Sequence, residues 1–211
     1  MKLRLAAAFS GTVALVALVY SLLALRPALR LIGVHFPRQA WLNDNPHLWQ
    51  LGTWLWLLAI FGWMLLLVVV SWSYLPGHRI PTMLQGGLLT IAAVLTIAGV
   101  AIWMSALPWA MRQPDAAQWS ALVDVVALGL LGAGLFMAGL VSAWQAVDLV
   151  RLNHLPPAWA APMFLAGAAI TPSPFLLPAG WQIATGALLW VGWCFFLATR
   201  SAIPSAYSEW R

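Results

Sequence analysis

Carboxylic acids are the scarcest of the residues in this chain that could do chemistry. The 211 residues contain five of them: Asp44, Asp115, Asp124, Asp148 and Glu209. General acid–base catalysis needs titratable groups held at the reacting atoms, and five acids leave few candidates. The sequence also lacks a phosphate-binding or dinucleotide glycine motif, a cysteine pair, a His-x-x-Glu-His zinc motif and a Gly-x-Ser-x-Gly nucleophile elbow. We therefore expect a protein that is not an enzyme.

Asp124 is the most informative acid, because it lies inside a long apolar segment. Trp119 marks one end of that segment, which places Asp124 about 7–8 Å further in at 1.5 Å per residue. If the segment crosses a membrane, an ionised carboxylate costs about 2.5–3.5 kcal/mol at the bilayer centre and less near the interface. Asp124 should then face other helices and have a partner, or be protonated. The ends of neighbouring segments offer four candidate partners: Tyr20, Arg26, Gln182 and Thr185.

Two interpretations of Asp124 stay open. It could form a proton or ligand site with Tyr20 and Arg26, and with deep tryptophans such as Trp54 and Trp190. It could instead make a hydrogen bond or ion pair that fixes helix packing. The structural interpretation is favoured, because a single acid without a second intramembrane acid makes a poor proton relay.

A second group of polar residues is expected at the opposite end of the same segment. Asp148 and Arg151 are three residues apart, so on a helix they share a face and can pair. His78, Arg79 and His154 belong to two loops that should lie nearby. This cluster could bind a metal, a haem edge or a lipid headgroup. Ordinary loop charges at headgroup level are the favoured interpretation.

The four histidines disfavour a buried haem. Axial ligands of a transmembrane haem lie on helices within the bilayer, whereas these four fall in loops or at segment ends: His35, His47, His78 and His154. Chlorophyll-type ligation near an interface stays open, and the cofactor, if there is one, is unknown. The one cysteine, Cys194, lies in an apolar segment and is expected to be a packing residue.

Glycines gather on the segment that holds Asp124. Together with nearby alanine and serine they form several small-xxx-small spacings, which let helix backbones approach closely. We expect this face to be used inside the chain rather than for dimerisation. The glycines are Gly129, Gly132, Gly134 and Gly139.

The composition sets the class of protein that holds these residues. Hydrophobic residues make up 63% of the chain and charged residues 7%, whereas a soluble domain has about 25% charged residues. The apolar runs are continuous and about twenty residues long, which is the length of a helix that crosses a hydrocarbon core of about 30 Å. An alternating barrel pattern is missing. The sequence predicts an all-α polytopic membrane bundle.

Charges, prolines and tryptophans divide the chain into about six spans within a single transmembrane domain. The expected spans are 5–25, 48–74, 82–107, 117–147, 158–177 and 181–199. Pro46, Pro81, Pro114 and Pro157 each stand just ahead of a span, where a missing N–H is tolerated, and Asp44 and Asn45 could cap the second span. Pro172 and Pro174 interrupt the fifth, so it is either a kinked full crossing, which we prefer, or a re-entrant segment.

The longest connection, residues 26–47, interleaves apolar residues with Arg30, His35 and Arg38, which is typical of a segment on the membrane surface. With six spans, both termini share one side. Six basic residues would then be inside (Lys2, Arg4, Arg79, Arg151, Arg200 and Arg211) and four outside (Arg26, Arg30, Arg38 and Arg112). This bias favours cytoplasmic termini in a bacterial-type inner membrane. Because the basic residues are scattered singly, the net charge of +5 reflects topology and not nucleic-acid binding.

These features predict a non-catalytic accessory or scaffold subunit of a larger membrane assembly, in contact with lipids and with other membrane subunits. Two alternatives stay open. One is a binder of a lipophilic small molecule such as a quinone, carotenoid, pigment or lipid. The other is a small proton-coupled transporter that uses Asp124.

Overall fold

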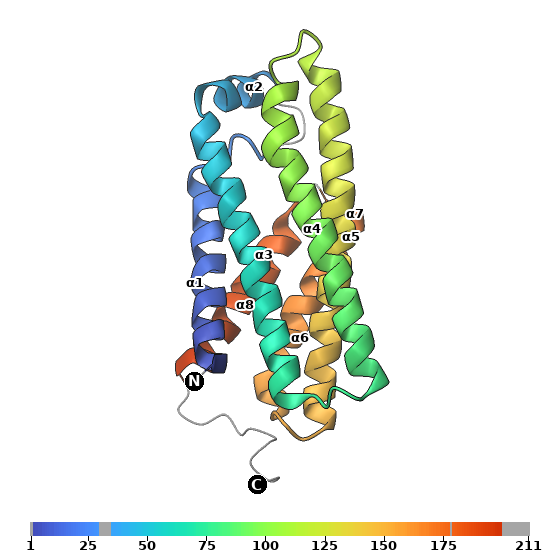
Figure 1. Ribbon diagram of the computed structural model, residues 1–211. Coiled ribbons are helices and arrows are strands. Elements are labelled where there is room, and N and C mark those ends of the chain that lie inside the picture. The colour runs from blue at the N-terminus through green and yellow to red at the C-terminus, as the bar shows by residue number, and fades with distance from the viewer. Residues whose placement is uncertain (1, 30–34, 178, 200–211) are drawn as a thin grey trace.

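The computed structural model describes residues 2–29, 35–177 and 179–199, and the regular structure of this part of the chain is entirely helical (Figure 1). The helices are α1 (Lys2–Leu23), α2 (His35–Asp44), α3 (Pro46–Tyr74), α4 (Ile80–Ala110), α5 (Ala116–Arg151), α6 (Pro157–Ile170), α7 (Ser173–Leu176) and α8 (Trp181–Thr199). The all-α bundle expected from the composition is confirmed. Arg30, Arg200 and Arg211, which entered the charge bias, lie outside the described residues.

Proline starts helices where the sequence predicts it. Pro46 and Pro157 are the first residues of α3 and α6, and Pro81 is the second residue of α4. A proline there loses no helical hydrogen bond, because the first N–H groups of a helix have no partner within it. The expected side-chain cap of α3 is wrong, however. Asn45 makes no capping bond, and its amide donates to the Trp41 carbonyl at 3.1 Å.

Five helices, α1, α3, α4, α5 and α8, are long and apolar enough to cross a membrane. They have 19 to 36 residues, or about 28–54 Å at 1.5 Å per residue, against a core of about 30 Å. Large apolar side chains such as Leu23, Phe61 and Val125 are exposed on their outer faces. Exposed apolar surface on this scale belongs in lipid, so the chain is a multi-pass integral membrane protein.

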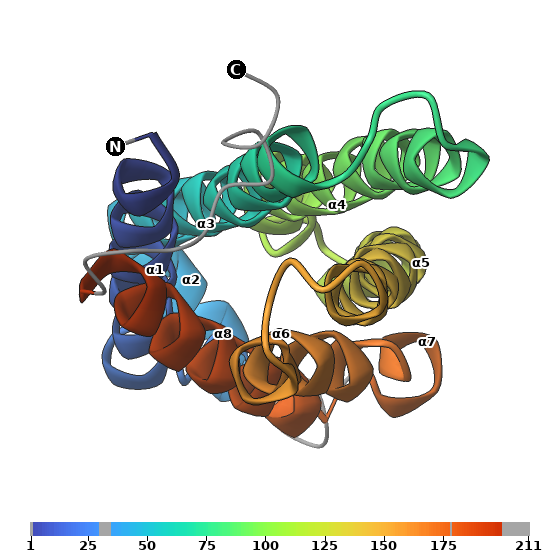
Figure 2. The ribbon, with the colours of Figure 1, turned by 90° about the horizontal axis from the view of Figure 1, so that it is seen from below.

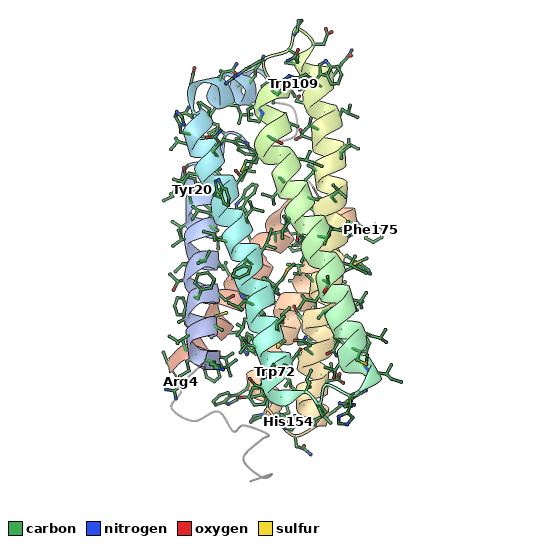
Figure 3. All side chains as sticks on the ribbon, in the orientation of Figure 1. Arg4, Tyr20, Trp72, Trp109, His154 and Phe175 are labelled. Atoms are coloured by element: carbon green, nitrogen blue, oxygen red, sulfur yellow. The ribbon has the colours of Figure 1, made fainter. Side chains whose placement is uncertain are left out.

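The expected fifth span, 158–177, is not one continuous helix. α6 has 14 residues, about 21 Å, and the chain then breaks at Thr171 and Pro172 before the short α7. A Cβ built on Gly132, near the middle of α5, would lie 3.2 Å from the Cα of Pro174 in α7. The tip of the α6–α7–α8 hairpin therefore lies about halfway along α5, where Phe175 is exposed (Figure 3). This geometry favours the re-entrant alternative over the full crossing that we preferred.

The helices form a closed ring when the bundle is viewed along its axis (Figure 2). Each helix contacts the next in the order α1, α3, α4, α5, α6 and α8, and α8 contacts α1 again. Two tryptophans link the helices that flank α1 in this ring. Trp63 of α3 and Trp190 of α8 stack with ring centroids 4.2 Å apart and planes 2° from parallel. The start of α1 and the end of α8 lie at the same end of the bundle, which we name the lower end as in Figure 1.

The long connection contains a helix and is anchored in the protein. α2 lies across the upper end of the bundle (Figure 1). Its Leu42 is 1% exposed and its Arg38 is 4% exposed. Leu42 packs with Leu25, Trp49 and Leu107 in the upper core cluster. The surface location expected for residues 26–47 thus holds for only one face of α2, because its other face is buried among the spans. The side chain of His35 and residues 30–34 lie outside the described part.

Candidate functional site

Asp124 is held by a buried ion pair at the upper end of the bundle. Arg38 of α2 donates from both terminal nitrogens to the two carboxylate oxygens, at 2.5 and 2.8 Å. The indole N–H of Trp103 donates to the same carboxylate at 2.9 Å. The remaining Arg38 nitrogen, Nε, donates to the Ala28 carbonyl at 2.8 Å. Arg38 therefore joins the first connection, α2 and α5 at one point.

Three tryptophan rings pack together beside this ion pair, which the Trp103 indole contacts directly. Trp49, Trp56 and Trp103 pack together with centroids 5.9 to 6.1 Å apart. The Trp49 indole donates to the Trp103 carbonyl at 3.2 Å, and that of Trp56 donates to Ser21 at 2.7 Å. These bonds connect α1, α3 and α4 beside the carboxylate. Burial of the pair, with side-chain exposures of 4% for Arg38 and 14% for Asp124, strengthens the attraction between the opposite charges.

The chemistry available to Asp124 follows from these contacts. Its two oxygens accept three hydrogen bonds, and one donor carries a full positive charge. Both oxygens are engaged by donors from two other helices, α2 and α4. The arrangement is suited to fastening α2 to the bundle.

The partners expected for Asp124 lie elsewhere. Tyr20 donates to the Leu48 carbonyl at 3.1 Å, and Arg26 is exposed. Of the deep tryptophans, Trp54 is 55% exposed, and Trp190 is fully buried in a second core cluster, where it packs with Trp193 and Trp63. The four residues grouped with Asp124 in the sequence therefore do not form one site with it.

The other two candidate partners of Asp124 are on α8. Thr185 donates to the Trp181 carbonyl at 3.0 Å. Gln182 is buried, and neither of its amide atoms has a partner among the described residues. Sequence reasoning missed Arg38 as the partner, because Arg38 is one of three arginines in residues 26–47 and nothing in the sequence singles it out.

Asp148 at the lower end is buried, but its partner is not Arg151. The side-chain amide of Gln85 in α4 donates to Asp148 at 2.8 Å, while Arg151 points outward and is exposed. The expected Asp148–Arg151 pair is thus replaced by a contact between α4 and α5. One turn away, Gln145 of α5 donates to Ser71 of α3 at 2.8 Å. Both glutamines connect neighbouring helices.

The remaining members of the expected lower cluster are dispersed. His78 is exposed, and the His154 ring lies 6.2 Å from the Tyr74 ring, centroid to centroid. Within the described residues, no three histidine, cysteine or acidic side chains come close enough to hold a metal ion. The metal and haem-edge interpretations of this cluster gain no support from the geometry.

A cavity of about 310 Å³ lies beside this lower end. We name it the α3–α4 cavity, because its lining comes from the end of α3, the start of α4 and their connection: Val68, Ser71, Trp72, Leu75, Gly77 and Thr82. Four buried polar atoms in this region have no hydrogen-bond partner among the described residues: Arg79 Nη1, Thr82 Oγ1, Gln85 Oε1 and Gln145 Oε1. Of these residues, only Arg79 was a candidate from the sequence.

Three of the four glycines on α5 contact neighbouring helices within the chain. A Cβ on Gly134 would lie 2.5 Å from Thr96 of α4, and one on Gly139 would lie 2.6 Å from the Gly167 carbonyl of α6. Gly132 faces α7, whereas Gly129 has open space around it. The glycines therefore serve two faces of α5, one against α4 and one against the hairpin, because a 36-residue helix packs against both.

Comparison with protein-family models, curated proteins and solved structures finds no match to this chain.

Proposed function

We propose that this protein is a non-catalytic accessory or scaffold subunit of a larger membrane assembly. The observation that carries the proposal is the use of the buried polar side chains: Arg38 with Asp124, Gln85 with Asp148, and Trp190 with Ser10 each join two different helices. Groups bonded in this way hold a ring of helices in one geometry, and they are not poised to react with a substrate. Such a ring offers partners an outer surface of constant shape.

The location that goes with this role is a bacterial-type inner membrane with both termini in the cytoplasm. The bias of lysine and arginine toward the lower end supports this orientation. The exposed apolar faces of α1, α3, α4 and α5 are then available to lipids and to the transmembrane helices of partner subunits. Polar contacts inside the ring leave these faces free of charge, as a lipid-facing or subunit-facing surface requires.

Gentle detergent purification of the tagged chain from its native membrane, followed by quantitative mass spectrometry, tests the role. We expect one or more integral membrane proteins to co-purify at a fixed ratio to this chain, while abundant membrane proteins of similar size do not. Purification of the chain alone, in a detergent that preserves other membrane complexes, would contradict the proposal.

A second candidate function, the binding of a lipophilic molecule, is favoured by one observation. The α3–α4 cavity combines an apolar lining with buried polar atoms that lack a partner. Extraction of the purified protein with organic solvent, followed by mass spectrometry of the extract, tests this candidate. One compound recovered at a fixed ratio to the chain supports it, and an extract that matches bulk membrane lipid contradicts it.

Proton-coupled transport through Asp124 has less support, because the carboxylate is engaged by Arg38 and Trp103. Its test is pH-dependent uptake into proteoliposomes by the wild type and by a folded Asp124→Asn variant. Uptake by the wild type that is lost in the folded variant would support transport through Asp124.

A further inference from the structure

We propose that the α3–α4 cavity binds the phosphate group of an anionic membrane lipid, with Arg79 and Thr82 as its polar ligands. This inference deepens the second candidate function and does not depend on the role as an accessory subunit. It rests on where the cavity lies, on the polar atoms left without partners beside it, on the sign of the local charge and on the apolar surface around its mouth.

The cavity lies where a lipid headgroup would lie. It is formed at the end of α3 and the start of α4, at the lower end of the bundle, where Trp72 is found (Figure 3). Val68 and Trp72 line it and are 52% and 83% exposed, so the cavity opens on the outer surface. Tryptophan is enriched at the level where hydrocarbon meets headgroups. A volume of about 310 Å³ is at the lower end of the range for small-molecule sites.

Two donors, one on a lining residue and one on a residue next in sequence to the lining, lack a partner among the described residues. They are the Arg79 Nη1 nitrogen and the Thr82 hydroxyl, and both atoms are buried. Thr82 lines the cavity, and Arg79 lies in the connection between Gly77 and Thr82, which are both lining residues. A buried donor without an acceptor is costly, and a charged one most of all. An acceptor supplied by a bound molecule removes this cost.

The charge around the cavity selects an anion. Arg79 immediately precedes α4, at the positive end of that helix dipole, and His78 is the residue before it. The acid of the same region, Asp148, is bound by Gln85 and makes no ion pair within the described residues. Arginine binds phosphate oxygens through directed, charge-assisted hydrogen bonds, which makes phosphate the best match among common anions.

Apolar surface on both sides of the cavity selects a lipid over free phosphate. Val68, Trp72 and Leu75 form an apolar lining on α3 and its end. Ile80, Met83 and Leu84 at the start of α4 are exposed beyond the cavity and would lie beside acyl chains. Basic pockets between helices at the cytoplasmic side are a recurring way to recognise anionic headgroups. The proposed occupant is therefore a phospholipid with a net negative charge.

Thermal unfolding of delipidated protein in a non-ionic detergent tests the inference. The additives are phosphatidylglycerol, phosphatidylcholine and inorganic phosphate, each over a range of concentrations. We compare the wild type with Arg79→Gln, with the nearly isosteric Thr82→Val, and with Arg112→Gln as a control. Arg112 is an exposed arginine just after the end of α4, whereas the cavity lies at the start of that helix.

We expect phosphatidylglycerol to raise the unfolding temperature of the wild type and of Arg112→Gln more than phosphatidylcholine does. The apparent affinity for phosphatidylglycerol should fall about tenfold or more in Arg79→Gln and a few-fold in Thr82→Val, because each loses one donor to phosphate. Native mass spectrometry should show one retained phosphatidylglycerol on the wild type and none on Arg79→Gln. If Arg79→Gln does not fold, Thr82→Val carries the test, since it preserves shape and charge.

Two results would overturn the inference. Equal stabilisation of the wild type and both cavity variants by phosphatidylglycerol would show that the lipid acts elsewhere. Inorganic phosphate could instead stabilise the wild type as strongly as phosphatidylglycerol does, with the effect lost in Arg79→Gln. The cavity would then be a site for free phosphate and not for a lipid.

Discussion

The contribution of the Arg38–Asp124 pair to stability is the most direct prediction of the upper end of the structure. Replacing Arg38 by methionine leaves the Asp124 carboxylate, at a side-chain exposure of 14%, with Trp103 as its one remaining donor among the described residues. Replacing Asp124 by asparagine leaves the Arg38 charge buried without an acid, at 4% exposure. Removing one member of a buried ion pair costs about 3–5 kcal/mol, because the other charge stays uncompensated. We expect each single substitution to lower the free energy of unfolding by about 3–5 kcal/mol.

The double variant, Arg38→Met with Asp124→Asn, tests whether the two side chains stabilise the protein as a pair or through independent contacts. With both charges removed, no uncompensated charge is buried, and the asparagine oxygen can still accept from Trp103. We expect the double variant to cost about as much as one single variant or slightly more. The coupling energy of the Arg38–Asp124 cycle should then be about 2–4 kcal/mol.

The assay is reversible unfolding in mixed micelles with increasing sodium dodecyl sulfate, followed by far-ultraviolet circular dichroism. Arg26→Met is the matched control, because Arg26 is an exposed arginine in the same connection, and its change should stay within about 0.5 kcal/mol. Single-variant losses that add up in the double variant to within about 0.5 kcal/mol would refute the claim that the two side chains act as a pair.

Two further predictions use the same unfolding assay. Gly139→Ala should lower the free energy of unfolding by about 1–3 kcal/mol, because its Cβ would lie 2.6 Å from the Gly167 carbonyl oxygen. Gly129→Ala, where the added Cβ has open space, should leave that free energy unchanged or raise it by up to about 1 kcal/mol. Equal effects of the two substitutions would contradict the packing assigned to α5. Ser10→Ala should lose about 1–3 kcal/mol, because it removes the acceptor at 2.9 Å from the buried Trp190 indole N–H; an unchanged midpoint would show that this N–H has another acceptor.

The fold class and most of the helices follow from the sequence, because their causes are local. A continuous apolar run longer than the hydrocarbon core forms a helix wherever it lies in the chain, since backbone groups in lipid must be bonded within the segment. The expected span 48–74 differs from α3, Pro46–Tyr74, by two residues at its start. Hydropathy could not decide the segment 158–177, where the outcome depends on how α7 packs beside the middle of α5.

The candidate sites were predictable in part. Burial cost requires that Asp124 have a partner or be protonated, and the structure supplies Arg38 and Trp103 as partners. The identity of the partner was not predictable, because Arg38 is 86 residues away on a connection whose path is set by tertiary packing. For Asp148, the nearest cation in sequence was the wrong choice. Arg151 can reach water from the helix end, whereas Gln85 faces Asp148 across the α4–α5 contact.

Sequence alone therefore determines that this chain is a helical membrane protein, where most of its helices lie and which buried charge must be compensated, because these depend on transfer free energies summed over neighbouring residues. Tertiary structure decides that Arg38 compensates Asp124, that Trp63 stacks on Trp190, and that a cavity opens beside Thr82. These features depend on which helix faces come together, and apolar helices in lipid have little hydrophobic preference among faces. Close packing and a few directed polar bonds make that choice.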